Sequence, residues 1–263
     1  MRNNHAMCDI PAVKWAMEDI PADVRDKGYL SRFIDTTYSV PLDECYSPSH
    51  PMGRRKCLKY RSILMGYMKD LNLITGSEDC MEAGVPYTDY CEGMMSPGYY
   101  RNADCGRYIT AKYTGDKVED NSKKFMMDGK YRVPLWELVY GDCMVSYWYW
   151  GDSSNSCPEY IPRRDLLNAL YGTPPMYNVT VSQWEEYKEQ IKESYKRAGL
   201  VALHTSAAEM LSFEYLTADK MVQKTVFEGG VSIVANFGET PYTLPDGKVV
   251  QPVDKVVYGI EGA

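Results

Sequence analysis

The strongest constraint on the fold is an alternation of short apolar runs with a long helical pattern near the N-terminus. The run "GYLSRFID", residues 28–35, has the length and composition of a strand, and so has "NLITGSED", residues 72–79. Between them, the apolar residues of 53–71 recur at helical spacing. The order strand, helix, strand is typical of a parallel sheet or barrel. We therefore predict an α/β fold.

Three later segments have the character of further strands. They are "YCEGMMS", "VPLWELVYGD" and "LLNALYGTPPMY", at residues 90–96, 133–142 and 166–177. Residues 182–197 predict a helix, with Ser182 and Glu185 as its capping box. One apolar face is expected on it, formed by Trp184, Tyr187, Ile191 and Tyr195.

The pattern changes near residue 200. Two β-type runs surround Glu228-Gly229-Gly230, and Asp246-Gly247 marks a turn. Short strands with hairpin signals and no helix predict an antiparallel β module. We therefore place a domain boundary there, with one domain at 1–200 and a second at 201–263.

Charge and hydropathy exclude several partners. The net charge is −7 and the longest basic cluster is "RRK" at Arg54, so we expect no nucleic-acid partner. No apolar run approaches the ~20 residues that span a membrane, and no signal peptide is visible. The sequence as it stands predicts a cytoplasmic protein, with the compartment left open. The 23 tyrosines and five tryptophans together greatly outnumber the five phenylalanines, which suits a sugar-binding cleft or, alternatively, a tyrosine-rich surface.

The cysteines give no metal or redox motif by their spacing. Eight are present, none forms a C-x-x-C pair, and the three histidines lie far from zinc-finger spacing. We therefore predict reduced thiols, no metal site and no cofactor.

Carboxylates follow the predicted strands at the point where each ends. Asp35 closes the first run and Glu78 follows the second, while Glu92 and Asp142 accompany two later ones. In a βα barrel the active site lies at the C-terminal ends of the strands. Two carboxylates at neighbouring strand ends can supply the nucleophile and the acid/base of retaining glycoside hydrolysis. The alternatives are a turn or N-cap carboxylate for Asp35 and a cap of the next segment for Glu78.

Other polar and aromatic residues are candidates for substrate binding. Glu44 lies on the same loop as Asp35 and could orient substrate, and His50 is either a substrate contact or a loop-packing histidine. Asp142 is a further candidate, and the segment "SYWYWGDSSN" brings Trp148, Trp150 and Asp152 close in sequence. Tryptophan faces stack on sugars and a carboxylate can hold hydroxyl groups. A hydrophobic core segment is the alternative.

Together these motifs resemble glycoside hydrolase family 129 and its relatives near family 101. The stretches that carry the resemblance cover most of the chain in order: "FIDTT…DECYSPSHP", "ITGSED", "DYCEGMMSPGYYR", "VPLWELVYGDCMVSYWYWGDSSN", "LLNALYGTPPMY" and "VFEGGVSIVANFGETPYTLPDG". The resemblance implies a retaining α-N-acetylgalactosaminidase, or a related α-glycosidase, acting on a carbohydrate. Asp35 matches the nucleophile at the end of the fourth barrel strand, and Glu78 matches the acid/base after the fifth. Trp148, Trp150 and Asp152 match an aromatic segment near the sugar.

The sequence departs from that family in two ways. Gly141 stands where relatives tend to have histidine, and only about 29 residues precede the strand that ends at Asp35. We therefore expect a partial (β/α)8 TIM-type barrel, about strands 4 to 8, followed by a small antiparallel β-sandwich. A cut barrel exposes a parallel edge, so we expect poor solubility or association with a complementary N-terminal half. The alternative function is a non-catalytic carbohydrate-binding remnant.

Overall fold

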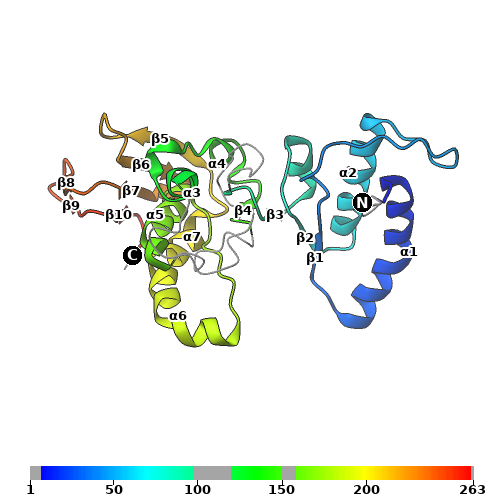
Figure 1. Cartoon of the computed structure of the whole chain (residues 1–263), viewed down its shortest axis with the longest axis horizontal. Coiled ribbons are helices and arrows are strands. Elements are labelled where there is room, and N and C mark those ends of the chain that lie inside the picture. Colours follow the sequence, from blue (N-terminus) through cyan, green and yellow to red (C-terminus); the bar gives the residue numbers. More distant parts are fainter. Residues whose placement is uncertain (1–6, 97–119, 150–157, 262–263) are drawn as a thin grey trace. The chain divides into compact units, whose positions relative to one another are not determined.

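The computed structural model describes residues 7–96, 120–149 and 158–261 (Figure 1). The chain divides into two compact units, Met1–Cys91 and Glu92–Ala263. Each unit is described by itself below. Across the described parts of the chain, the helices are all too short or too polar to cross a membrane.

The first unit contains the predicted strand, helix and strand. Strands β1 (Ser31–Ile34), β2 (Ile74–Ser77) and β3 (Tyr90–Cys91) pair in parallel, with β2 between the other two. Helix α2 (Arg54–Asp70) connects β1 to β2, and a 3-10 segment, η1 (Glu82–Tyr87), leads from β2 to β3. Helix α1 (Asp9–Lys27) precedes β1 and ends at Gly28, whose φ of 67° is left-handed. These elements confirm the α/β prediction.

The helices of this unit share a small apolar core. Val13 and Ile20 of α1 pack with Leu64 and Met68 of α2, and Leu73 closes the cluster just before β2. Burying side chains of this kind contributes roughly 1.5–3 kcal/mol each. The cluster therefore fixes both helices beside the strands.

One glycine lets the parallel strands pack closely on one face. In β2, Gly76 pairs with Phe33 of β1 and with Tyr90 of β3. A Cβ at Gly76 would lie 2.2 Å from the Tyr90 ring, and the Phe33 and Tyr90 ring centres are 6.4 Å apart. The Tyr90 ring therefore occupies the space that a side chain at position 76 would fill.

The second unit begins with short elements. After helix α3 (Asp120–Met126) come a 3-10 turn (Gly129–Tyr131), helix α4 (Leu135–Tyr140) and the two-residue strand β4 (Val145–Ser146). A 3-10 turn (Pro158–Tyr160) leads into helix α5 (Ile161–Tyr171). Helix α6 (Val181–Ser194) continues through a π-helical turn (Tyr195–Gly199) into helix α7 (Leu200–Thr205).

An antiparallel sheet follows these helices, as the sequence predicts. Its strand order is β10-β7-β6-β5, formed by Asp254–Tyr258, Ser232–Asn236, Val222–Phe227 and Met210–Tyr215. A 3-10 turn (Glu228–Gly230) joins β6 to β7, and β8 (Tyr242–Thr243) pairs with β9 (Val249–Val250). The predicted turn lies between β8 and β9, with Gly247 at a φ of 85°. The boundary at residue 200, the partial barrel and the sandwich stay predictions.

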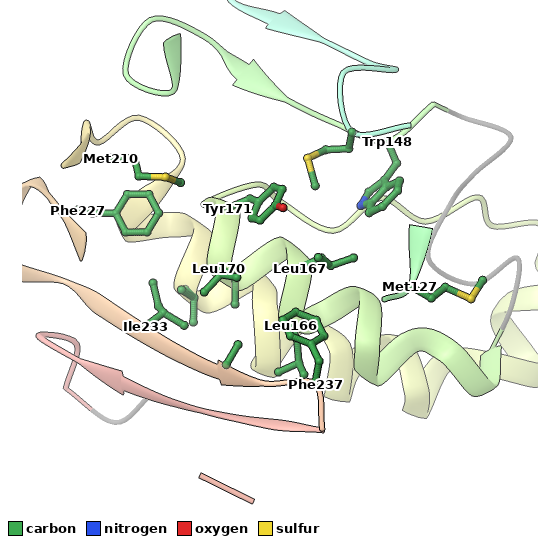
Figure 2. Close-up of a cluster of buried hydrophobic side chains, with 14 of the residues drawn as sticks. Met127, Trp148, Leu166, Leu167, Leu170, Tyr171, Met210, Phe227, Ile233 and Phe237 are labelled. Atoms are coloured by element: carbon green, nitrogen blue, oxygen red, sulfur yellow. The ribbon is translucent and has the colours of Figure 1, made fainter. Parts of the chain in front are cut away.

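The main core of this unit lies between α5 and the sheet (Figure 2). Leu166, Leu167 and Leu170 of α5 belong to the same buried cluster as Phe227 and Ile233 of the sheet. All five are at most 2 % exposed. Helix and sheet are therefore held together by one shared apolar layer.

Two of the predicted strands are wrong. Residues 133–142 contain helix α4, and 166–177 begin within helix α5, which ends at left-handed Gly172. Nearly every residue of α5 is buried, including the polar Arg164, Asp165 and Asn168, so the helix has no solvent-facing polar stripe of the kind that marks a surface helix. A short apolar run without periodicity does not distinguish a buried helix from a strand. The third segment, 90–96, is a strand only at Tyr90–Cys91.

The helix predicted at 182–197 is confirmed as α6, but its cap lies two residues earlier than predicted. Thr180 Oγ1 accepts a hydrogen bond from the Gln183 amide at 3.3 Å, and Gln183 Oε1 accepts one from the Thr180 amide at 2.9 Å. Ser182 and Glu185 lie inside the helix. Of the expected apolar face, Tyr187 and Ile191 are buried, while Trp184 and Tyr195 are exposed.

Candidate active site

Asp35 and Glu78 follow the ends of two neighbouring parallel strands. Ile34, the last residue of β1, is in register with Ser77, the last residue of β2. Asp35 and Glu78 are the next residues of each chain segment. Neighbouring strands lie about 4.8 Å apart. The register therefore delivers both carboxylates to the same edge of the sheet.

The backbone turns sharply directly after Asp35. Thr36 has a φ of 55°, which is uncommon for a β-branched residue. The hydroxyl of Thr37 donates to the Ile34 carbonyl at 3.2 Å, which closes the turn over the end of β1. Strained backbone of this kind is concentrated at functional sites. The Asp35 side chain is exposed and so is accessible to a ligand.

Glu78 is half-buried and is held by the loop that follows Asp35. Its Oε2 accepts a hydrogen bond from Ser39 Oγ at 2.8 Å. Because Ser39 is four residues beyond Asp35, this contact links the two carboxylate-bearing segments directly. Hydrogen bonds to a charged acceptor are among the stronger ones in proteins.

A third carboxyl group, Asp79, directly follows Glu78 in the chain. Burial, and after it the negative charge of Glu78, raises the pKa of Asp79 to about 7. Asp79 is therefore protonated over much of the acid range, where it adds no second charge beside Glu78. In the sequence, the only sign of this third carboxyl group is that Asp79 directly follows Glu78 after the predicted strand.

The two other candidates of the first unit make their contacts within the loop and at the start of α2. Glu44 is exposed, accepts a hydrogen bond from the Tyr46 hydroxyl, and lies 3.7 Å from Arg54 Nε through Oε1. His50 Nδ1 lies 3.3 Å from Cys45 Sγ. A substrate-binding role for either residue stays a prediction.

In the second unit, Trp148 is fully buried. Its Nε1 donates to Asn168 Oδ1 at 2.7 Å, and the Arg164 guanidinium lies 4.1 Å from a ring centre of the indole. With 0 % of its surface exposed, Trp148 fits the core-segment alternative rather than an open sugar platform (Figure 2). The sequence pattern of alternating aromatics does not separate these two cases.

The three remaining candidates are Asp142, Trp150 and Asp152. Asp142 is exposed and follows helix α4, so it does not close a strand as predicted. Trp150 and Asp152 lie outside the described residues. Their roles stay predictions.

Solved structures with a similar fold include several of one bacterial enzyme. The ligand-free form of the α-N-acetylgalactosaminidase NagBb from Bifidobacterium bifidum is 22% identical with a TM-score of 0.62, over 88% of this chain and 33% of that one. Its GalNAc complex is 20% identical with a TM-score of 0.61, over 88% and 34%. The likeness shows a shared fold, and the chain spans about one third of the length of that enzyme.

Sequence comparison gives the family. No curated protein matches the chain closely enough to count as a relative. A family model described as "Glycosyl hydrolases related to GH101 family, GH129" matches residues 2–226, which is most of the chain and includes both strand-end carboxylates. The chain therefore belongs to glycosyl hydrolase family GH129.

Proposed function

We propose that this chain carries the catalytic carboxylates of a retaining α-glycosidase that resembles an α-N-acetylgalactosaminidase. The observation that supports the proposal most directly is the register of Ile34 with Ser77. Asp35 follows the first of these residues and Glu78 follows the second. Retaining glycosidases need two carboxyl groups about 5–5.5 Å apart, close to the spacing of neighbouring strands.

In this mechanism the two carboxylates have different roles. The exposed Asp35 attacks the anomeric carbon while the bond to the leaving oxygen breaks, and Glu78 donates a proton to that oxygen. Glu78 then removes a proton from water, the water oxygen attacks the anomeric carbon, and Asp35 leaves as a free carboxylate. The hydrogen bond from Ser39 fixes Glu78 for both proton transfers.

The sugar is proposed from the family relationship. The similar enzyme from Bifidobacterium bifidum is named an α-N-acetylgalactosaminidase and has a structure in complex with GalNAc. We take an α-N-acetylgalactosaminide as the substrate of this site. The strands β1 to β3 would then be consecutive strands of a (β/α)8 barrel, and residues 201–263 the β-sandwich that follows it.

The chain matches only about a third of that enzyme, and this makes a partner part of the proposal. A half-barrel has strand edges and apolar faces that other strands of the barrel would cover. We therefore propose that the site is complete when these strands are supplied by further polypeptide.

The test is hydrolysis of an aryl α-N-acetylgalactosaminide by the chain expressed in its complete natural reading frame. Asp35→Asn and Glu78→Gln should each reduce turnover by at least about 100-fold. Glu18→Gln, on the exposed face of α1, is the matched control and should leave turnover unchanged.

Azide distinguishes the two roles. With Asp35→Ala, azide should restore turnover and give the β-glycosyl azide, because azide replaces the nucleophile from the same face. With Glu78→Ala and an activated aryl substrate, azide should give the α-glycosyl azide by attack on the glycosyl-enzyme. If Asp35→Ala gave the α-glycosyl azide and Glu78→Ala gave the β-glycosyl azide, Glu78 would be the nucleophile and Asp35 the acid/base.

The alternative, a non-catalytic carbohydrate-binding remnant, is tested by the same variants. Binding of GalNAc that neither substitution affects, without turnover of any aryl substrate, would support it. The burial of Trp148 removes one half of the stacking platform on which that alternative depended.

A further inference from the structure

Two cysteines and a histidine converge in the first unit, away from the strand ends. Cys8, Cys45 and His50 each offer one ligand atom, and these three atoms all lie within 4.8 Å of one another. All three side chains are half-buried. Cys8 comes from the start of α1 and the other two from the loop between β1 and α2.

Two of these atoms have nearly the spacing of ligands around one small cation. Cys45 Sγ and His50 Nδ1 are 3.3 Å apart. Around a tetrahedral Zn²⁺, with Zn–S about 2.3 Å and Zn–N about 2.0–2.1 Å, sulfur and nitrogen ligands are about 3.6 Å apart. A displacement of a few tenths of an ångström would therefore place the two atoms on a common metal.

The backbone around the ligands is fixed by hydrogen bonds. Cys45 and Met52 form an antiparallel bridge in which each amide donates to the other carbonyl, at 2.8 and 2.9 Å. Within this closed loop the His50 amide donates to the Ser47 carbonyl at 3.2 Å. The Cys8 carbonyl accepts from the Ala12 amide and so begins α1. The three ligands therefore stand on ordered backbone.

The neighbouring carboxylate is already occupied by other partners. Asp9 Oδ2 lies 3.4 Å from Arg61 Nε and accepts a hydrogen bond from Cys57 Sγ at 3.0 Å. Arg61 is buried and also pairs with Asp43 at 3.4 Å. Asp9 is thus committed to neutralising a buried arginine.

We propose that Cys8, Cys45 and His50 bind one Zn²⁺ ion, with water as the fourth ligand. Two thiolates and an imidazole suit a borderline-soft cation and disfavour Mg²⁺ or Ca²⁺, which take oxygen ligands. Two thiolates also balance the charge of the ion. The metal would join the first turn of α1 to the loop that follows the Asp35 turn. This role is structural and is independent of the proposed glycosidase function.

The test uses the full chain, reduced and freed of metal by a chelator. Titration with Zn²⁺ should give one ion per chain, measured by calorimetry and by elemental analysis after dialysis. Co²⁺ should give the absorption bands of thiolate-to-metal charge transfer. Cys45→Ser and His50→Gln should each weaken Zn²⁺ binding by at least about 100-fold. Cys143→Ser and His204→Gln, which change an exposed cysteine and an exposed histidine of the other unit, should leave the affinity unchanged.

A readout on the unaltered chain covers the case in which the variants fail to fold. Zn²⁺ should protect Cys8 and Cys45 from alkylation by iodoacetamide, as mapped by mass spectrometry, while Cys143 reacts equally with and without metal. The proposal is overturned if the reduced chain binds no stoichiometric Zn²⁺, or if both ligand variants retain it. It is also overturned if Cys8 and Cys45 oxidise to a disulfide equally fast with and without Zn²⁺. These results do not depend on turnover of any glycoside.

Discussion

The hydroxyl of Ser39 donates a hydrogen bond to the Glu78 carboxylate. Under the proposed mechanism, Ser39→Ala removes the hydrogen bond that positions the proton donor. A hydrogen bond to a charged group is worth about 1.5–3 kcal/mol, so we expect a fall in kcat of about 10-fold or more. A positioning role predicts a larger loss for aryl substrates with poor leaving groups, which need the proton most.

A second serine of the same loop is the control for this experiment. The Ser49 hydroxyl contacts the Ser47 hydroxyl at 2.9 Å and lies on the exposed part of the loop. Ser49→Ala should leave kcat unchanged. A uniform loss for good and poor leaving groups in Ser39→Ala would indicate a structural role instead.

Glu137 gives a pH-dependent prediction for stability. It is 6 % exposed, and burial raises its pKa from 4.5 to about 7, against the opposing charge of Arg132. The folded state therefore holds a proton that the unfolded state has lost between these two pKa values. Stability from this group is present at low pH and is lost as the pH rises from about 4.5 to 7, by about 3 kcal/mol in total.

Glu137→Gln removes this titration. We expect the variant to match the unaltered chain near pH 4 and to be more stable at pH 8, in urea unfolding followed by circular dichroism. Glu214→Gln, which changes an exposed carboxylate of β5, should keep the original pH profile. Parallel profiles for Glu137→Gln and the unaltered chain would show that Glu137 does not carry the effect.

At the scale of residues, the sequence predicts what depends on local order along the chain. Asp35 and Glu78 could be placed because each directly follows a strand that the apolar pattern marks. The Cys8, Cys45 and His50 cluster could not, because its members come from segments that only the fold brings together. The absence of zinc-finger spacing therefore carried no information about this site.

Among the elements, the N-cap of helix α6 can be tested by substitution. Thr180→Ala removes the acceptor for the Gln183 amide and should destabilise the helix by about 1 kcal/mol. Ser182→Ala, at the cap position that the sequence suggests, should destabilise the helix by only about a few tenths of a kcal/mol. Hydrogen exchange of the α6 amides measures both. The reverse order of effects would favour the Ser182 cap.

Elements whose apolar residues recur at regular spacing, or whose ends are marked in the sequence, could be predicted. A helix buried on nearly all sides could not. Strands β1 and β2 and helices α2 and α6 match their sequence signals closely. Helix α5 does not, because it is buried on nearly all sides, and even its polar residues Arg164, Asp165 and Asn168 are removed from solvent. Tertiary burial, which the sequence alone does not reveal, decided that element.

For the whole molecule, the two separate apolar clusters predict that each unit can be destabilised without the other. Met68 belongs to the cluster of the first unit and Leu167 to that of the second, and both are 0 % exposed. Each change to alanine should cost about 2–5 kcal/mol. We expect Met68→Ala to lower hydrogen-exchange protection within residues 9–91, and Leu167→Ala to lower it within 158–261.

The exposed Leu203, at 70 % exposure, is the control for the second substitution, and Leu203→Ala should change protection little. Loss of protection in both units after either core substitution would show that they unfold as one cooperative structure. At this scale the sequence motifs were sufficient to identify the GH129 family, because they extend over most of the chain.

The register of Ile34 with Ser77 also restricts how the gene of such a chain can change in length. Removal of one residue from β2 would move Glu78 by about 3.3 Å and turn the following side chains to the opposite face. Residues 35–53 lie outside β1 and β2, so a change in length there would leave this register unchanged. Gaps among related sequences should therefore spare the four residues before each carboxylate.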